Sequence, residues 1–539
     1  MTRRKLTVFL LTAVVGVALA TSATAQVADS EHHYRVEDLR LDNGWTLSEN
    51  GVWLDALQDE RISQVEVAGD VEQGELKDYN GAERSLAFTV DACSYMRLTK
   101  RLALYGQIGY RNFTGYNMSG SYFIDPSQMP FDIVEYTQEN GGKKHLEHYN
   151  VAGMAAYRIA DWVAIGAGVD YSAANYAKRK DLRHINSMMD MSVTAGVKFT
   201  IGQRLQIGGN YIYRRRNESL QLSVYGTTDR KYSSLLSYGA LFGKIEILSD
   251  SGYTKEDENK PLFDTYHGGS LQLLWQISPA VAWFNQVDYR VRKGYYGEPS
   301  PYTVVYANHS GNNLSYDGAI TIAGSRADHT VELSYLRTKV ANNENLYRYY
   351  NESGGLSFVE YLGQTQTGTR TEQRADVRYT SRIDTDRDTP KWSVRAAAQF
   401  CNRNTYAVNY PDYRRQAISY WRADVAAERN IRYTRNIFTL GLGLGSGAGF
   451  GEPFKDGSYT SGSSQTLTRT LDDMLRHEYE YLTAYRLGVG VDVGYARYLG
   501  QKNILCYARA EILWQKAFES IYMGRAQRIR AQLTLGCYF

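Results

Sequence analysis

QRIRAQLTLGCYF, residues 527–539, alternates between apolar and polar side chains along its whole length. The apolar positions are Ile529, Ala531, Leu533, Leu535, Cys537 and Phe539. The positions between them hold Arg528, Arg530, Gln532, Thr534, Gly536 and Tyr538. Because successive side chains of a β-strand point to opposite faces, this stretch predicts a strand with one apolar face and one polar face.

The same alternation recurs upstream, in segments that are long for the strands of a soluble protein. Residues 504–514, 485–495 and 438–444 each place apolar side chains on one face and charged residues or glycine on the other. A soluble strand usually has about 5–6 residues. A soluble β-sandwich also alternates, but its wet face would seldom carry so many glycines. The pattern therefore predicts an all-β fold, a transmembrane antiparallel up-and-down β-barrel.

Composition supports a sheet with one wet and one apolar face. Among 539 residues there are 45 tyrosines and 48 glycines but only 9 prolines, so the glycines do not belong to a disordered Pro/Gly-rich chain. Hydrophobic residues make up 43% of the chain, yet the mean hydropathy is −0.46. No apolar run after the N-terminus is long enough for a membrane-spanning helix.

The N-terminus has the pattern of a secretory signal peptide, residues 1–25. Arg3, Arg4 and Lys5 precede an apolar run over residues 6–19, and Ala23-Thr24-Ala25 supplies a small-x-small cleavage site. A membrane anchor is disfavoured because the apolar run is short for a span. We expect export and cleavage before Gln26, and no cysteine follows that would be lipidated.

The net charge argues against a nucleic-acid partner. Three of the 61 Lys and Arg residues lie in the predicted signal, which leaves 58, equal to the 58 Asp and Glu residues of the chain. A formally neutral exported chain lacks the basic excess of a nucleic-acid binder.

From about Ser63 to Phe539 the chain resembles bacterial outer-membrane β-barrel proteins, with a porin-like architecture. The signal peptide, the repeated alternation and the terminal Gly536-Cys537-Tyr538-Phe539 carry this resemblance. It is also similar to uncharacterised single-chain outer-membrane barrels of about this length. The resemblance implies the outer membrane of a Gram-negative cell, with membrane lipid, lipopolysaccharide and the barrel-assembly machinery as partners. It does not imply a function, because one fold serves many.

Compact junctions between alternating runs predict about 18 strands, with 16 as the alternative. The junctions lie near Thr99-Lys100, Ala160-Asp161, Gly202-Gln203, Ser278-Pro279, Ser325-Arg326, Thr385-Asp388, Tyr433-Thr434 and Gly500-Gln501. One strand before the first junction, at about Ser63 to Lys77, and one at the C-terminus complete the count. Short turns are expected on the periplasmic side and long loops outside the cell.

The predicted organisation is a signal peptide (1–25), an N-terminal segment (26–60) and a barrel (61–539). The N-terminal segment would either lie on the periplasmic rim or insert into the lumen. The long extracellular loops are expected at Asn117 to Lys144, Asn217 to Lys260, Asn342 to Gly368 and Gly449 to Glu478, the last with a short helix at residues 471–475.

If Phe539 faces lipid, the opposite parity faces the lumen and carries the charges. An Arg or Lys facing lipid at the midplane would cost about 2–4 kcal/mol, so the charged face must point inward. The candidate lumen residues are Arg486, Asp492, Arg509, Glu511, Arg528, Arg530, Asp288, Arg290, Arg374, Asp376 and Arg378. They would either bind and steer a polar solute or form structural Arg–carboxylate pairs, and the mixture of signs favours pairs.

The cysteines and histidines indicate no cofactor, no metal site and no enzyme. Cys506 and Cys537 would be neighbours on the lipid face, either bridged or simply two small apolar residues. His145, Glu147 and His148 could form a weak metal site, but an exposed cluster at a strand end is favoured. No G-x-S-x-G motif occurs.

The sequence thus favours a gated or narrow channel for small polar solutes. The alternative is an occluded structural or interaction barrel, such as an adhesin, a receptor or a scaffold for an outer-membrane protein partner, that acts through its long loops. A barrel enzyme acting on lipid is a weaker third hypothesis.

Overall fold

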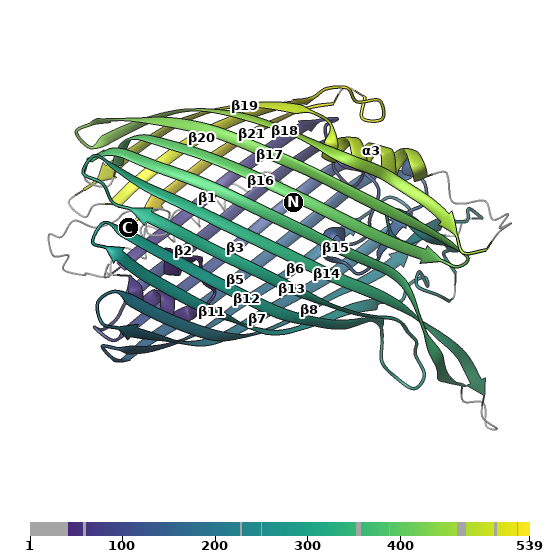
Figure 1. Ribbon diagram of the computed structural model, residues 1–539. Helices are drawn as coiled ribbons and strands as arrows, with labels where there is room; N and C mark the ends of the chain where they lie inside the picture. The colour runs from purple at the N-terminus through teal and green to yellow at the C-terminus, as the bar shows by residue number, and fades with distance from the viewer. Residues whose placement is uncertain are drawn as a thin grey trace.

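In the computed structural model the chain forms a closed barrel of 18 antiparallel strands (Figure 1). β1 (Arg61–Gly74) pairs with β2 (Arg84–Arg97) on one side and with β21 (Gln527–Tyr538) on the other, which closes the sheet. The other wall strands are β3 (Leu102–Met118), β5 (Gly142–Ala160), β6 (Val163–Lys178), β7 (Arg183–Ile201), β8 (Leu205–Ser223), β11 (Lys260–Ser278), β12 (Val281–Gly297), β13 (Val305–Ile322), β14 (Ala327–Asn351), β15 (Ser357–Asp386), β16 (Thr389–Asn409), β17 (Asp412–Tyr433), β18 (Asn436–Ser458), β19 (Arg486–Leu499) and β20 (Ile504–Ala517).

The structure describes most of the chain after the N-terminus. The described residues are 41, 43–57, 61–226, 229–249, 251–351, 357–386, 389–460, 471–500, 504–524 and 526–539. The expected signal peptide, residues 1–25, lies outside them, as do residues 26–40 of the expected N-terminal segment.

The predicted strand count of 18 and the predicted junctions are confirmed, and the alternative of 16 is wrong. Each of the eight junctions falls between two consecutive wall strands. At two of these turns Gly202 and Gly500 have φ angles of 61° and 66°, a region that glycine enters without the steric penalty of a Cβ atom. The first strand is β1, which begins two residues before the predicted Ser63 and ends at Gly74.

One expected loop is largely strand, and a second begins as strand. β14 and β15 continue through most of Asn342 to Gly368 and pair up to Asn351 and Ser357, so they project as a long hairpin beyond the rim (Figure 1). β18 likewise runs to Ser458, past the expected start of its loop at Gly449. The short helix is longer than predicted, because α3 spans Asp472–Thr483. In both hairpins the backbone hydrogen bonds continue beyond the end of the apolar stripe. The alternation of hydrophobicity predicts a strand only where such a stripe is present.

The outer surface of the barrel is apolar. Leu440, Leu442 and Leu444 of β18 are 60%, 54% and 59% exposed, and Leu533 and Leu535 of β21 are exposed in the same way. Their charged or glycine neighbours in sequence point inward. A closed barrel with an apolar outer band is the architecture of outer-membrane proteins, so the tight turns mark the periplasmic end and the long loops the extracellular end. No helix in the described part of the chain is long and apolar enough to cross a membrane.

The outward face also carries the one disulfide of the described chain. Cys506 and Cys537 are direct partners in the β20–β21 register, with Cα atoms 4.1 Å apart, and are bonded. Of the two alternatives for this pair, the structure has the bridge. Cys93 and Cys401 take no part in a disulfide within the described chain.

Candidate functional site

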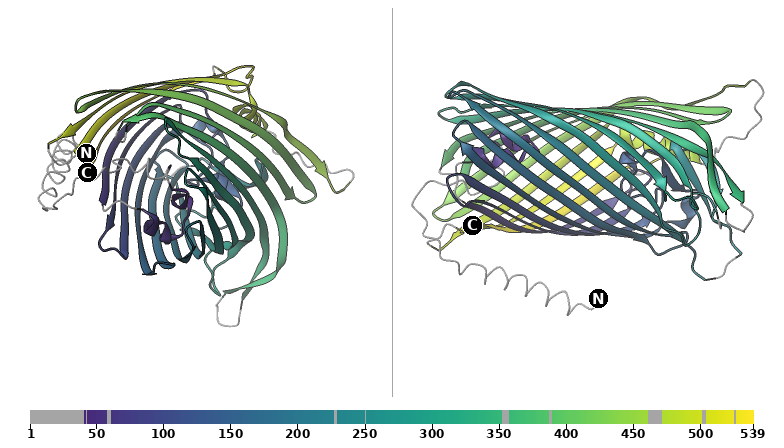
Figure 2. Two further views of the ribbon diagram at one scale, coloured as in Figure 1. Left: turned by 60° about the vertical axis from the view of Figure 1, so that its left-hand side comes forward. Right: turned by 90° about the horizontal axis from the view of Figure 1, so that it is seen from below.

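Part of the N-terminal segment lies inside the periplasmic half of the lumen. Residues 43–57 form two short turns, η2 (Gly44–Leu47) and η3 (Gly51–Ala56), which lie inside the barrel mouth (purple in Figure 2). Asn43 and Asn50 cap these turns by accepting hydrogen bonds from backbone N–H groups two residues ahead. We call residues 43–57 the periplasmic seal.

Trp45 anchors this seal to the wall. Its ring is fully buried, lies 5.6 Å from the ring of Phe284, and donates a 2.6 Å hydrogen bond from Nε1 to Gln206 Oε1. The ring fits because Gly208 carries no side chain, and a Cβ atom there would lie 2.6 Å from the indole. The indole thus fills a gap left by the wall glycine, as expected for a core aromatic residue whose N–H finds a partner.

Asp55 ties the other end of the seal to two wall cations. Its carboxylate lies 2.8 Å from Arg158 Nε and 2.8 Å from Lys198 Nζ. Burial raises the pKa of Asp55, but the charges of Lys198 and Arg158 outweigh burial and hold that pKa below its usual value. The carboxylate is therefore ionised at neutral pH and compensates the buried Lys198.

Two inward-folded loops occupy part of the extracellular half of the lumen. β4 (Asp132–Glu135), from the loop after β3, joins β9 (Ser233–Gly239) and β10 (Phe242–Ile247), from the loop after β8, in a separate sheet of three strands. This sheet and residues 119–131 pack on lumen-facing side chains of the wall. The core that they share contains Tyr122, Phe131, Ile133, Leu236, Leu262 and Tyr296. We call residues 119–140 and 233–247 the extracellular plug.

Three wall arginines hold the tip of this plug. Arg370 on β15 donates to the carbonyl oxygens of Pro126, Ser127 and Met129. Arg292 on β12 donates to the carbonyl oxygen of Gln128 at 2.8 Å, and Arg216 on β8 donates to the Gln128 side chain at 2.8 Å. These strands lie within one run of six neighbouring wall strands, β8-β11-β12-β13-β14-β15, so the tip is bound to one side of the wall at three points. We call Arg216, Arg292 and Arg370 the latch.

Two buried carboxyls complete the plug. Glu135 forms a 2.6 Å ion pair with Lys178 on β6, and both side chains are almost fully buried. Asp132 accepts a 2.5 Å hydrogen bond from Ser121 Oγ, while its Oδ2 has no hydrogen-bond partner in the described structure. Burial raises the pKa of Asp132 to about 7, against the opposing effects of Ser121, the Ile133 N–H, Lys144 and Arg370.

This pKa makes the closed plug sensitive to pH. A pKa raised above the usual value of 3.8 means that Asp132 stabilises the closed plug most at low pH, and that this stabilisation is lost as the pH rises through about 7. We expect proteolysis of the plug in intact proteoliposomes to be several-fold faster at pH 8 than at pH 5. Lys144, Arg370 and Tyr79 face the same carboxyl.

The matched variants separate Asp132 from other titrating groups. Asp132→Asn should make the rate of proteolysis of the plug nearly equal at pH 5 and pH 8. Asp125→Asn, on the same loop, should retain the pH dependence of the wild type. Equal pH profiles for the wild type and Asp132→Asn would contradict this role of Asp132.

A cavity of about 340 Å³ remains between the plug, α3 and the wall strands β15–β17. Its charged and polar lining comprises Asp78, Tyr79, Asp132, Arg370, Glu372, Arg403, Tyr420 and Glu478. Glu478 on α3 pairs with Arg403 at 2.9 Å, which holds the helix against the wall. Arg403 Nε, like Asp132 Oδ2, is buried with no hydrogen-bond partner among the described residues. Both of these side chains belong to the lining of the cavity.

The residues predicted to line the lumen occupy inward positions, but they form separate ion pairs around the wall. The pairs are Arg528 with Glu72 (2.6 Å), Arg509 with Glu428 (2.6 Å) and Asp492 (3.0 Å), Arg290 with Asp288 (2.8 Å), Arg374 with Asp376 (2.7 Å) and Arg378 with Glu332 (3.3 Å). Arg530 pairs with Asp70, Arg486 donates to the Tyr481 carbonyl oxygen, and Glu511 lies opposite Asp492 in the β19–β20 register. The structure therefore does not bring them together at one point.

Sequence reasoning missed Arg370, Glu372 and Arg403, which line the cavity. Arg370 and Glu372 continue the inward parity of Arg374 and Asp376 on the same strand, so the signal was present. Both residues lie next to the expected loop Asn342 to Gly368, so they were not identified as part of the lumen wall. Among the described residues no group of three or more His, Cys, Asp or Glu side chains could hold a metal ion.

Comparisons with known proteins give one family match and several remote structural similarities. Residues 51–539 match the model of a family described as "Family of unknown function (DUF6850)". The chain is similar to the crystal structure of BauA, the ferric preacinetobactin receptor from Acinetobacter baumannii, with 9% identity, 89% of this chain and 80% of that chain covered, and a TM-score of 0.40. It is similar to the FrpB iron transporter from Neisseria meningitidis, with 7% identity, coverage of 91% and 83%, and a TM-score of 0.37. It is also similar to the CymD monoaromatic hydrocarbon channel, with 8% identity, coverage of 93% and 94%, and a TM-score of 0.30. No curated protein matches the sequence.

Proposed function

The chain belongs to this family of unknown function, and we propose that it is a gated outer-membrane channel for a small polar solute. The observation that supports this proposal best is the polar cavity beneath the extracellular plug. Its volume of about 340 Å³ lies in the range of small-ligand sites. Charged side chains of both signs line the cavity, among them Arg370, Arg403 and Glu372, and these would supply hydrogen bonds to a polar solute.

The way in which both seals are attached supports gating. The periplasmic seal and the extracellular plug are held by ion pairs, hydrogen bonds and packed side chains, and neither belongs to the wall of the barrel. Loops that fold into a rigid barrel can move while the wall stays intact. We therefore propose a resting closed state from which the plug withdraws.

The wall between the seals would form the path of the solute. Arg509, Glu428 and Asp492 form one inward network, with both signs of charge within 3.0 Å of each other. Such a lining suits a dipolar or uncharged polar solute better than one kind of ion, because neither sign dominates. We also propose that residues 1–25 are removed on export and that the assembly machinery of the outer membrane inserts the barrel.

Single-channel recording of the refolded chain in a planar bilayer tests the proposal. The expected result is a closed baseline with brief openings whose conductance changes in the variant Arg509→Ala/Arg530→Ala, because both arginines line the path. Added small polar solutes should then be screened for block of these openings. A folded, heat-modifiable barrel that never opens, even when the latch is removed, would contradict the channel hypothesis.

A second candidate function is supported by the long β14–β15 hairpin, which projects beyond the rim (Figure 1). Tyr349, Tyr350 and Leu362 on this hairpin are 57%, 54% and 59% exposed. Exposed aromatic and aliphatic groups are typical of protein-binding surfaces. An interaction barrel would remain without conductance, and removal of the hairpin tip would abolish partner binding without changing the folded barrel.

A further inference from the structure

An area of the outer wall on β8 and β11 to β14 is strongly cationic, and no proposed channel function requires it. On β8 and β11 to β14 the outward positions contain four cations, Arg215, Lys293, Arg337 and Lys339, and no Asp or Glu. Arg215 and Lys293 lie in the extracellular halves of β8 and β12, Lys339 lies at the midpoint of the long strand β14, and Arg337 lies two residues before it. We call them the rim cations.

Strand register places the rim cations beside one another. Arg215 and Lys293 both pair with Thr265 of β11, from its two sides, so their backbones are two strands apart, about 10 Å. Asn312 of β13 pairs with Lys339 on one side and with Val291, two residues before Lys293, on the other. The cluster therefore spans neighbouring strands at one end of the barrel.

The rim cations lie just beyond the apolar band. Tyr289 and Tyr211, four residues before Lys293 and Arg215 on their strands, are 50% and 53% exposed. Outward aromatic residues mark the boundary between hydrocarbon and headgroups, so the cations beyond them lie in the extracellular headgroup layer. Arg215 lies over the ring of Phe263 at 5.4 Å, and no rim cation has a carboxylate partner among the described residues. Such a cluster is complementary to lipid phosphates.

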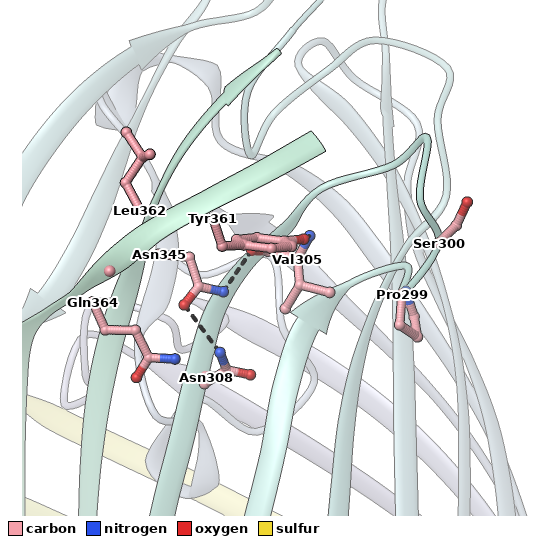
Figure 3. Close-up of a pocket in the computed structure, with 9 residues that line it drawn as sticks. Pro299, Ser300, Val305, Asn308, Asn345, Tyr361, Leu362 and Gln364 are labelled. Carbon is pink, nitrogen blue, oxygen red and sulfur yellow. Dashed lines mark hydrogen bonds between the residues drawn. The ribbon is translucent and has the colours of Figure 1, made fainter. Parts of the chain in front are cut away.

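A pocket of about 590 Å³ lies at the extracellular ends of β13 to β15, next to the rim cations in the strand register. Asn308, which lines it, is on the same face of β13 as Ser310, the register partner of Lys293. Asn308 donates to Asn345 Oδ1 at 3.0 Å, and Asn345 donates to the Val305 carbonyl oxygen at 2.7 Å. Tyr361, Gln364 and Ser300 add an aromatic ring, an amide and a hydroxyl to the lining (Figure 3). Amides and hydroxyls beside an aromatic ring suit a sugar, which has many hydroxyls and an apolar C–H face.

We infer that this area binds the headgroup of a phosphorylated glycolipid of the outer leaflet. The rim cations hold the phosphates, and the pocket above them holds sugar residues attached to the same lipid. The rim cations face outward, and the pocket shares no residue with the cavity between the plug and the wall, so the site is separate from the one that supports the channel proposal. This site gives one glycolipid a specific binding position on the outer wall.

Binding of bisphosphorylated lipid A to the full chain in detergent, measured by native mass spectrometry, tests the phosphate site. Lys293→Gln/Lys339→Gln should weaken binding about tenfold or more, because two charges that contact the headgroup are lost. The matched control is Arg429→Gln/Arg497→Gln, which removes two outward cations from the periplasmic ends of β17 and β19. This control should bind lipid A as the wild type does, and both variants should remain heat-modifiable barrels.

Three outcomes would overturn the phosphate site. One is unchanged affinity in Lys293→Gln/Lys339→Gln, and another is an equal loss in the control, which would indicate general electrostatics. The third is equal displacement of lipid A by inorganic phosphate, which would assign the cluster to a free anion. Dephosphorylated lipid A should bind the wild type and the variant equally weakly.

The sugar pocket has its own test. Asn308→Ala/Gln364→Ala should weaken binding of a glycolipid that carries core oligosaccharide, and should leave binding of lipid A unchanged. An equal effect on both probes, or on neither, would contradict the assignment of sugars to the pocket.

Discussion

Replacing Arg292 and Arg370 together by alanine is expected to raise the open probability of the barrel by about a hundredfold. Arg370 alone donates to three carbonyl oxygens of the plug tip, and Arg292 donates to a fourth. Hydrogen bonds from charged groups contribute about 1.5–3 kcal/mol each, so a net loss of about 3 kcal/mol is a conservative expectation. Each 1.4 kcal/mol is a factor of about ten in an equilibrium. Single-channel recording measures the effect directly.

The control is Arg374→Ala/Arg378→Ala, which removes two inward arginines from β15. These arginines pair with Asp376 and Glu332 on the wall and not with the plug. The open probability should therefore stay near that of the wild type, although the conductance of each opening changes. If both double variants open equally often, the latch does not hold the plug, and general loosening of the lumen explains the effect.

Replacing Trp45 by alanine is expected to release the periplasmic seal. Truncation of a buried tryptophan costs about 3–5 kcal/mol, and the seal is only 15 residues long, so little else replaces this contact. In proteoliposomes with the periplasmic end exposed, protease should then cleave within residues 43–57 at least tenfold faster than in the wild type. Mass spectrometry of the fragments identifies the site of cleavage.

Trp162→Ala is the matched control, because Trp162 lies in a periplasmic turn and is 60% exposed. Its loss should not change the rate of cleavage in the seal. Asp55→Ala offers an independent variant: it leaves Lys198 buried without its partner, which costs about 3–5 kcal/mol when a buried pair is broken. Slow cleavage in both Trp45→Ala and Asp55→Ala would show that the seal is held by other contacts.

Much of the barrel could be predicted because its determinants are local. The alternation of Ile529 to Phe539 and the tight turns at Gly202 and Gly500 each depend on a few neighbouring residues. They led to the strand count, the closure and the face on which each charge lies. The same reasoning missed the extension of the β14–β15 hairpin, because strands beyond the membrane have no apolar stripe to mark them.

The pairing of the lumen charges was predictable in kind but not in detail. Interleaved signs on the inward face favoured Arg–carboxylate pairs over a single binding site, and the structure has such pairs. The partners themselves were not predictable, because Arg528 pairs with Glu72 across the closure of the barrel and Arg290 also pairs with Glu49 of the seal. Their role in binding a solute remains a prediction that the Arg509→Ala/Arg530→Ala variant tests.

The sequence by itself determined which side of each strand faces lipid, because a charge in hydrocarbon is too costly to leave any choice. Only the tertiary structure decided that segments of the chain enter the lumen at both ends. Trp45 fits against Gly208 and Phe284, and the tip at residues 126–129 is held by Arg370, more than 200 residues away along the chain. Such contacts depend on shape and hydrogen-bond geometry between distant segments, and no local period in the sequence encodes them.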